Sequence, residues 1–136
     1  KGIHSGELES TLLLKGNFTI IRLAETDKFF GAMNDEERTE LKERLQGELV
    51  QVKDVLVEKH CDLLILDEIM ALLHGGLISL EQLCELIEMK PDSMELVLTG
   101  RNAPEEIVAR ADLVTEMRCI KHYLDQGVPA RVGIEK

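Results

Sequence analysis

The stretch Leu63-Leu64-Ile65-Leu66-Asp67-Glu68 decides the fold, because four apolar residues lead without interruption into two carboxylates. An apolar run of this length that does not alternate with polar residues is typical of a β-strand covered on both faces. Strands of that kind occur in parallel sheets between layers of helices. The sequence therefore predicts a buried parallel strand at residues 63–66, with two acidic side chains at its carboxyl end.

One helix is predicted before this strand and one after it. Asn34 and Glu37 have the spacing of a capping box, and apolar residues then recur at helical steps to about Lys59: Leu41, Leu45, Leu49, Val52 and Leu56. Ser79 and Gln82 repeat the capping pattern after the strand. They introduce a second amphipathic segment that carries Leu80, Leu83, Leu86 and Ile87.

Three further segments have the composition of strands. Residues 18–23 are rich in β-branched and aromatic side chains, and residues 96–98 and 113–117 are short apolar runs. Pro104 lies where the first turn of another helix would begin. Because predicted strands alternate with helices, we expect a three-layer α/β fold with a mostly parallel sheet. The length fits a single domain over residues 1–136.

The charge and cysteine content exclude several classes of function. With 26 acidic and 16 basic side chains the net charge is −10, which repels nucleic acids and anionic membrane surfaces. No apolar run approaches the roughly 18 residues needed to span a bilayer. Cys61, Cys84 and Cys119 are odd in number and form no Cys-x-x-Cys pair, so neither a disulfide framework nor a zinc site is indicated. We therefore expect a cytoplasmic protein that binds neither nucleic acid nor membranes.

Polar residues lie at the carboxyl ends of three of the predicted strands, in the segments Asp67-Glu68, Thr99-Gly100-Arg101 and Glu116-Met117-Arg118. The carboxyl ends of parallel strands lie at one edge of a sheet, where ligands bind. Carboxylates there can hold Mg²⁺ against nucleotide phosphates, and arginines can bind phosphate oxygens through two N–H groups. Each residue also has a plainer explanation, since a carboxylate can cap the next helix and an arginine can lie in a solvated loop.

Three histidines and a phosphate-binding motif also bear on where a site lies. His60 and His74 have no partner at metal-ligand spacing, which favours a structural role for both. His122, next to Lys121, can serve as a phosphate or sugar ligand or lie on the surface. A phosphate-binding loop of the form Gly-x-x-x-x-Gly-Lys-Ser/Thr does not occur in these 136 residues.

Taken together, the motifs resemble the P-loop-type ATP:cob(I)alamin (corrinoid) adenosyltransferases over residues 63–135. The matching segments are Leu63 to Glu68, Leu98-Thr99-Gly100-Arg101-Asn102-Ala103-Pro104, Ala111 to Arg118, Lys121-His122-Tyr123, Gly127, Ala130 and Gly133-Ile134-Glu135. The resemblance implies a RecA-like fold that binds ATP and Mg²⁺. It also implies transfer of the 5'-deoxyadenosyl group to the reduced cobalt of a corrinoid, a homodimer, and a flavoprotein as reductant.

The resemblance assigns roles to individual residues. It implies that Glu68 is a magnesium ligand, with Asp67 as a weaker second, and that Arg101, Lys121 and His122 contact the nucleotide. Family members use aromatic residues to displace the lower ligand of the corrinoid, and Phe29-Phe30 occupies about that place. Packing of these two rings in the core is an equally good interpretation.

The family's first strand, phosphate-binding loop and second strand would precede Lys1. We therefore expect the sequence to be the carboxyl-terminal part of a longer domain, with doubtful activity by itself. Two alternatives stay open: a non-catalytic module that binds a nucleotide or a corrinoid, and another RecA-like ATPase.

Overall fold

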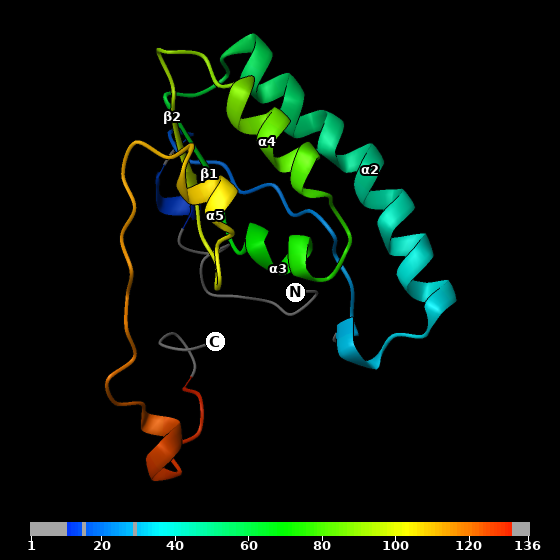
Figure 1. Cartoon of the computed structure of the whole chain (residues 1–136), viewed down its shortest axis with the longest axis vertical. Helices are drawn as coiled ribbons and strands as arrows, with labels where there is room; N and C mark the ends of the chain where they lie inside the picture. The colour runs from blue at the N-terminus through cyan, green and yellow to red at the C-terminus, as the bar shows by residue number, and fades with distance from the viewer. Residues whose placement is uncertain (1–10, 15, 29, 132–136) are drawn as a thin grey trace. The chain divides into compact units, whose positions relative to one another are not determined.

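The computed structural model describes residues 11–14, 16–28 and 30–131, and Figure 1 shows its elements. The chain divides into two compact units, one formed by Lys28–Leu113 and the other by the segments on either side of it. The larger unit contains every α-helix and β-strand labelled in Figure 1. The prediction of one domain over residues 1–136 stays a prediction.

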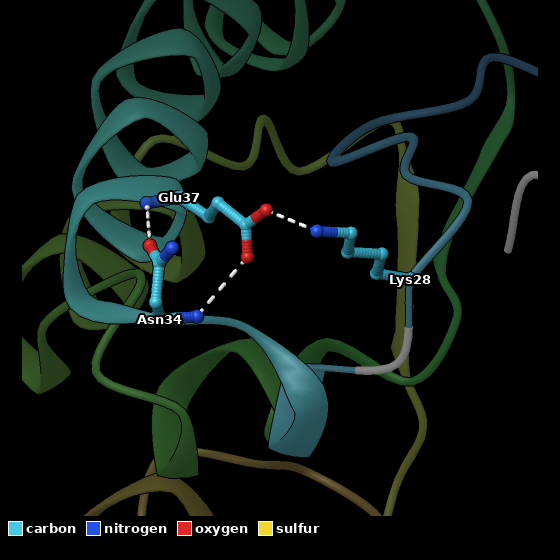
Figure 2. A network of polar contacts seen from close by, with 3 residues as sticks. All are labelled: Lys28, Asn34 and Glu37. Atoms are coloured by element: carbon cyan, nitrogen blue, oxygen red, sulfur yellow. Dashed lines mark hydrogen bonds and ion pairs between the residues drawn. The ribbon is translucent and has the colours of Figure 1, made fainter.

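The larger unit begins with a short 3-10 helix, Phe30–Ala32, and the long helix α2, Asp35–Glu58. A capping box starts α2 as predicted: Glu37 N–H donates to Asn34 Oδ1 at 2.8 Å, and Asn34 N–H donates to Glu37 Oε2 at 3.0 Å (Figure 2). The Lys28 ammonium donates to the same carboxylate. The bonds that the Glu37 carboxylate accepts from the Lys28 ammonium, the largest influence, and from the Asn34 N–H lower the pKa of Glu37 from its ordinary value of 4.5.

Replacing Asn34 with alanine should lower the free energy of unfolding by about 1 kcal/mol, because the first turn of α2 loses a hydrogen-bond acceptor for its N–H groups. Urea unfolding at neutral pH measures this loss. Asn17→Ala is the matched control, since Asn17 lies outside the helix. Equal losses in the two variants would contradict a specific role for the cap.

The same cap should make stability depend on pH. Because folding lowers the pKa of Glu37, its contribution is present above the unfolded pKa and is lost as the pH falls through the folded pKa. The variant Glu37→Gln should lack this part of the pH dependence. Unfolding free energies of parent and variant, measured from neutral pH to about pH 2, would show whether the two profiles differ.

The sheet consists of strands β1, Leu63–Leu66, and β2, Glu95–Leu98, which pair in parallel with Leu66 opposite Leu98. Helices α3, Ile69–His74, and α4, Leu80–Glu88, form the connection between the strands. The capping box at Ser79 and Gln82 opens α4 as predicted. The predicted strands at residues 63–66 and 96–98 are therefore confirmed, and so is their parallel pairing.

Helix α4 lies alongside α2, and their apolar faces form much of the core (Figure 1). Lys53 Nζ of α2 lies 2.8 Å from Glu85 Oε1 of α4, and Gln82 Nε2 donates to Gln46 Oε1. The buried core side chains are Met33, Leu41, Leu45, Leu49, Val52, Leu56, Leu66, Ile69, Met70, Leu77, Ile78, Leu83, Leu86, Met94 and Ile107. No helix in the described part of the chain is both long enough and apolar enough to cross a membrane.

Two predicted strands are not formed. Residues 18–23 and 113–117 adopt no regular structure, and large side chains there are exposed, such as Phe18 at 48% and Leu113 at 85%. A strand needs a neighbour for its backbone N–H and C=O groups, and the sheet of the described residues consists of β1 and β2 only. These two predictions are therefore wrong for the structure as described, because β-propensity does not provide a pairing partner.

The sheet is covered less completely than the sequence predicts. Leu66 is buried, but Leu63 and Ile65, on the other face of β1, are 49% and 45% exposed. A mixed α/β unit with a small parallel sheet is thus established, and the full three-layer arrangement stays a prediction. The last helix of the unit, α5, spans Glu105–Val108, with Pro104 at its N-cap, one residue before the predicted position.

Candidate functional site at the carboxyl ends of the strands

The parallel register brings two of the predicted polar segments together. Because Leu66 pairs with Leu98, the next residues of the two strands are neighbours. The Thr99 hydroxyl donates to Asp67 Oδ1 at 2.6 Å and accepts the Glu68 N–H at 2.8 Å. The predicted meeting of Asp67-Glu68 with Thr99-Gly100-Arg101 at one edge of the sheet is confirmed.

Glu68 has a backbone conformation that is uncommon for a residue with a side chain. It lies at the N-cap of α3 in the left-handed region, at φ 55° and ψ 27°, and its side chain makes no capping hydrogen bond. Helix capping therefore does not explain why a carboxylate occupies this position. Among the described residues, the exposed Glu68 carboxylate has no hydrogen-bond or ion-pair partner, so it is available to a ligand.

The loop after β2 is held tightly against α3. A Cβ atom on Gly100, which has φ 138°, would lie 2.6 Å from Met70 Cβ, closer than side chains can approach. Asn102 follows two residues after Gly100, and its carbonyl oxygen lies 2.9 Å from His74 Nε2. This bond gives His74 the structural role that its sequence context favours. Two contacts thus fix the loop that carries Arg101.

The donor chemistry of this edge suits a magnesium ion shared with phosphates. Mg²⁺ is usually held by one or two carboxylates together with water and substrate phosphates, and Glu68 offers an exposed, unpaired carboxylate. Arg101 is exposed, and the described residues contain no acidic partner for its guanidinium group. In the same part of the chain, no cluster of three or more His, Cys, Asp and Glu side chains could hold a metal by itself.

Lys121 and His122 belong to the smaller unit, so the structure does not test whether they join Glu68 and Arg101 at one site. Both residues are exposed. His122 Nδ1 accepts the Leu124 N–H at 3.0 Å and so caps the 3-10 helix Tyr123–Gln126. One ring nitrogen of His122 therefore has a local structural role.

The two phenylalanines assigned to the corrinoid are only partly described. Phe29 lies outside the described residues. Phe30 is half-buried, with the Arg38 guanidinium carbon 5.1 Å from its ring centroid. A Cβ on Gly75 would lie 3.3 Å from the same ring. These contacts support the packing interpretation for Phe30, and the contact of both rings with a corrinoid stays a prediction.

Sequence reasoning gave Thr99 no role of its own. In the sequence it is only part of the polar segment that follows residues 96–98, two positions before Arg101. The available signal was a hydroxyl at the first position after a strand that runs parallel to one ending in carboxylates. That signal has meaning only once the register of β1 and β2 is known.

Parallel strands joined by helices define the class of α/β proteins in which ligands bind at the carboxyl edge of the sheet, and here that edge carries carboxylates and an arginine. Comparison of the sequence with protein families assigns the chain to one family within this class. The sequence model of the ATP:corrinoid adenosyltransferase family BtuR/CobO/CobP matches residues 1–135. The chain belongs to this family, as the resemblance of its motifs implied.

Several curated relatives are named corrinoid adenosyltransferase. A corrinoid adenosyltransferase of Sinorhizobium sp is 37% identical over 86 residues, which are 62% of this chain and 40% of the relative. The corrinoid adenosyltransferase of Escherichia coli strain K12 is 31% identical over 83 residues, 61% of this chain and 42% of the relative. The corrinoid adenosyltransferase of Pseudomonas aeruginosa is 33% identical over 81 residues, which are 60% of this chain and 40% of the relative. The match thus spans about two-fifths of each relative's length.

Proposed function

We propose that this chain is part of an enzyme that transfers the 5'-deoxyadenosyl group of ATP to the reduced cobalt of a corrinoid and releases triphosphate. The reaction would serve cobalamin biosynthesis or salvage. The observation that carries this proposal is the family match over residues 1–135. The free carboxylate and guanidinium group at the strand ends support it, since both suit a metal-bound triphosphate.

Glu68 is the proposed magnesium ligand of this chain, and Arg101 the proposed contact for the phosphates. When bound, Mg²⁺ would neutralise charge that develops on the triphosphate leaving group. Asp67 already accepts the Thr99 hydroxyl, which fits a lesser role in metal binding. Lys121 and His122 are proposed as further contacts to the nucleotide.

The chemistry requires positioning more than a protein nucleophile. The reduced corrinoid substrate brings the attacking electron pair on its cobalt, so the side chains have to orient the ribose C5' and bind the triphosphate. An edge held by the Gly100 and His74 contacts suits this task, because a rigid loop keeps Arg101 in place. No covalent intermediate with the protein is part of the proposal.

The remaining features are proposed on the strength of the family. They are a three-layer RecA-like domain, a homodimer, a flavoprotein that reduces the corrinoid, and a cytoplasmic location. None of them requires nucleic acid or a membrane, in keeping with the net charge of −10.

The function is tested with the full-length gene product, purified and mixed with Mg²⁺, ATP and a chemically reduced corrinoid. Formation of an adenosylated corrinoid, followed by its absorption spectrum, and release of triphosphate in equal amount would support the proposal. Release of ADP and phosphate without adenosylation would favour another ATPase. Tight nucleotide or corrinoid binding without turnover would favour a binding module.

Replacing both Phe29 and Phe30 with alanine tests their proposed contact with the corrinoid. We expect the double variant to react slowly with a cobalt(II) corrinoid that must be reduced on the enzyme, yet normally with pre-reduced cobalt(I). Initial rates with the two substrates measure this contrast, and Phe18→Ala, which alters an exposed ring, is the control. Equal losses with both substrates would show that the rings only pack.

A further inference from the structure

We propose that Thr99 is a positioning residue that determines which of two adjacent carboxylates binds the metal. Its hydroxyl engages one oxygen of Asp67 and the backbone N–H of Glu68, which leaves the Glu68 carboxylate as the main ligand. This inference rests on the proposed function, because it concerns magnesium bound together with ATP. It adds a residue that contacts neither metal nor nucleotide and acts through Asp67 and Glu68, the two residues that follow β1.

The hydrogen bonds of Thr99 account for the difference between the carboxylates. A threonine hydroxyl has one proton to donate and lone pairs to accept with. Here the proton is donated to Asp67 Oδ1 at 2.6 Å, a length typical of a strong bond to a charged oxygen. A metal that took this oxygen would compete with that bond. The Glu68 carboxylate has no such partner among the described residues.

The second bond of Thr99 anchors the backbone of Glu68. A residue with a side chain is disfavoured in a sparsely populated backbone region, so such a conformation persists only where its surroundings hold it. The Glu68 N–H donates to the Thr99 hydroxyl at 2.8 Å, at the residue whose φ is 55°. Thr99 therefore helps to keep the turn in which Glu68 makes no capping bond with α3.

The packing around Thr99 makes the arrangement rigid. Thr99 N–H donates to the Leu66 carbonyl at 3.2 Å, which extends the ladder between β1 and β2 by one bond. The next residue, Gly100, lies against Met70 of α3. The backbone of Thr99 is thus fixed on both sides, and its hydroxyl is held by the bonds to Asp67 and Glu68.

The experiment measures how strongly Mg²⁺ enhances ATP binding, by calorimetric titration of the full-length protein with ATP in the presence and absence of Mg²⁺. Thr99→Val keeps the shape and removes the hydroxyl, so we expect the enhancement to fall by about tenfold, as for other groups that orient metal ligands. Thr99→Ser keeps the hydroxyl, and its enhancement should stay within about twofold of the parent. If Thr99 had a purely structural role, its replacement would change thermal unfolding but not the factor by which Mg²⁺ enhances ATP binding.

A second pair of variants tests the carboxylates themselves and does not depend on folding of the Thr99 variants. Asp67→Asn keeps an oxygen that accepts the Thr99 hydroxyl and removes only the weaker ligand, so it should lose less of the enhancement than Glu68→Gln, which should lose most of it. An unchanged enhancement in Thr99→Val, an equal loss in Thr99→Ser, or a loss in Asp67→Asn as large as in Glu68→Gln would overturn the inference. A parent protein whose ATP binding ignores Mg²⁺ would instead contradict the proposed function.

Discussion

Replacing Glu68 with alanine should abolish magnesium-dependent adenosyl transfer while changing the free energy of unfolding by no more than about 0.5 kcal/mol. The carboxylate is exposed and unpaired among the described residues, so it contributes little to the core. As a proposed metal ligand it would be required for charge neutralisation on the leaving triphosphate. Initial rates of adenosylation, measured beside thermal unfolding of the same preparation, separate the two effects.

The matched control is Glu43→Ala, which removes an exposed carboxylate from α2 and should leave both quantities unchanged. Glu68→Gln, which keeps the size and removes the charge, should behave like the alanine variant. Activity within about twofold of the parent in Glu68→Ala would remove Glu68 from the site.

The Gly100→Ala variant should be destabilised by about 2 to 4 kcal/mol, because the added Cβ atom causes both a steric clash and backbone strain. The added Cβ would lie 2.6 Å from Met70 Cβ and 2.9 Å from Met70 Cγ, and Met70 is buried. The φ of 138° is also in a region that residues with a side chain rarely adopt. Urea unfolding of parent and variant measures the loss, and relaxation of the loop should weaken ATP binding through Arg101.

Gly47→Ala provides the control for this substitution. Gly47 lies within α2, and a Cβ there meets nothing within 4 Å. Alanine is preferred over glycine inside a helix, so this variant should gain about 0.5 to 1 kcal/mol of stability. If both variants moved in the same direction, the close approach of Gly100 to Met70 would not be the cause of its effect.

The local features of this protein were determined by the sequence alone. Both capping boxes, at Asn34 and at Ser79, use residues three positions apart, so their hydrogen bonds form as soon as the helix does. The uninterrupted apolar run of β1 was recognisable for a similar reason, because its length and abrupt end are properties of adjacent residues. The family, too, followed from short motifs whose order and spacing can be read directly.

Tertiary structure alone decided which apolar segments became strands. Residues 18–23 and 113–117 have compositions like those of β1 and β2, yet only the latter two pair in the described part of the chain. The physical reason is that a strand is stabilised by a neighbour distant in sequence, which composition does not specify. The exposure of Leu63 and Ile65 has the same origin, since burial of a face depends on what packs against it.

The candidate site combines both kinds of information. The sequence alone placed Asp67, Glu68 and Arg101 after strands, and the rule for parallel sheets predicted their common edge. Only the register of β1 with β2 showed that the Thr99 hydroxyl reaches both Asp67 and Glu68, 31 to 32 positions earlier in the chain. Hydrogen bonds over such a separation depend on the direction of two backbones, which is a property of the folded chain and of no single segment in it.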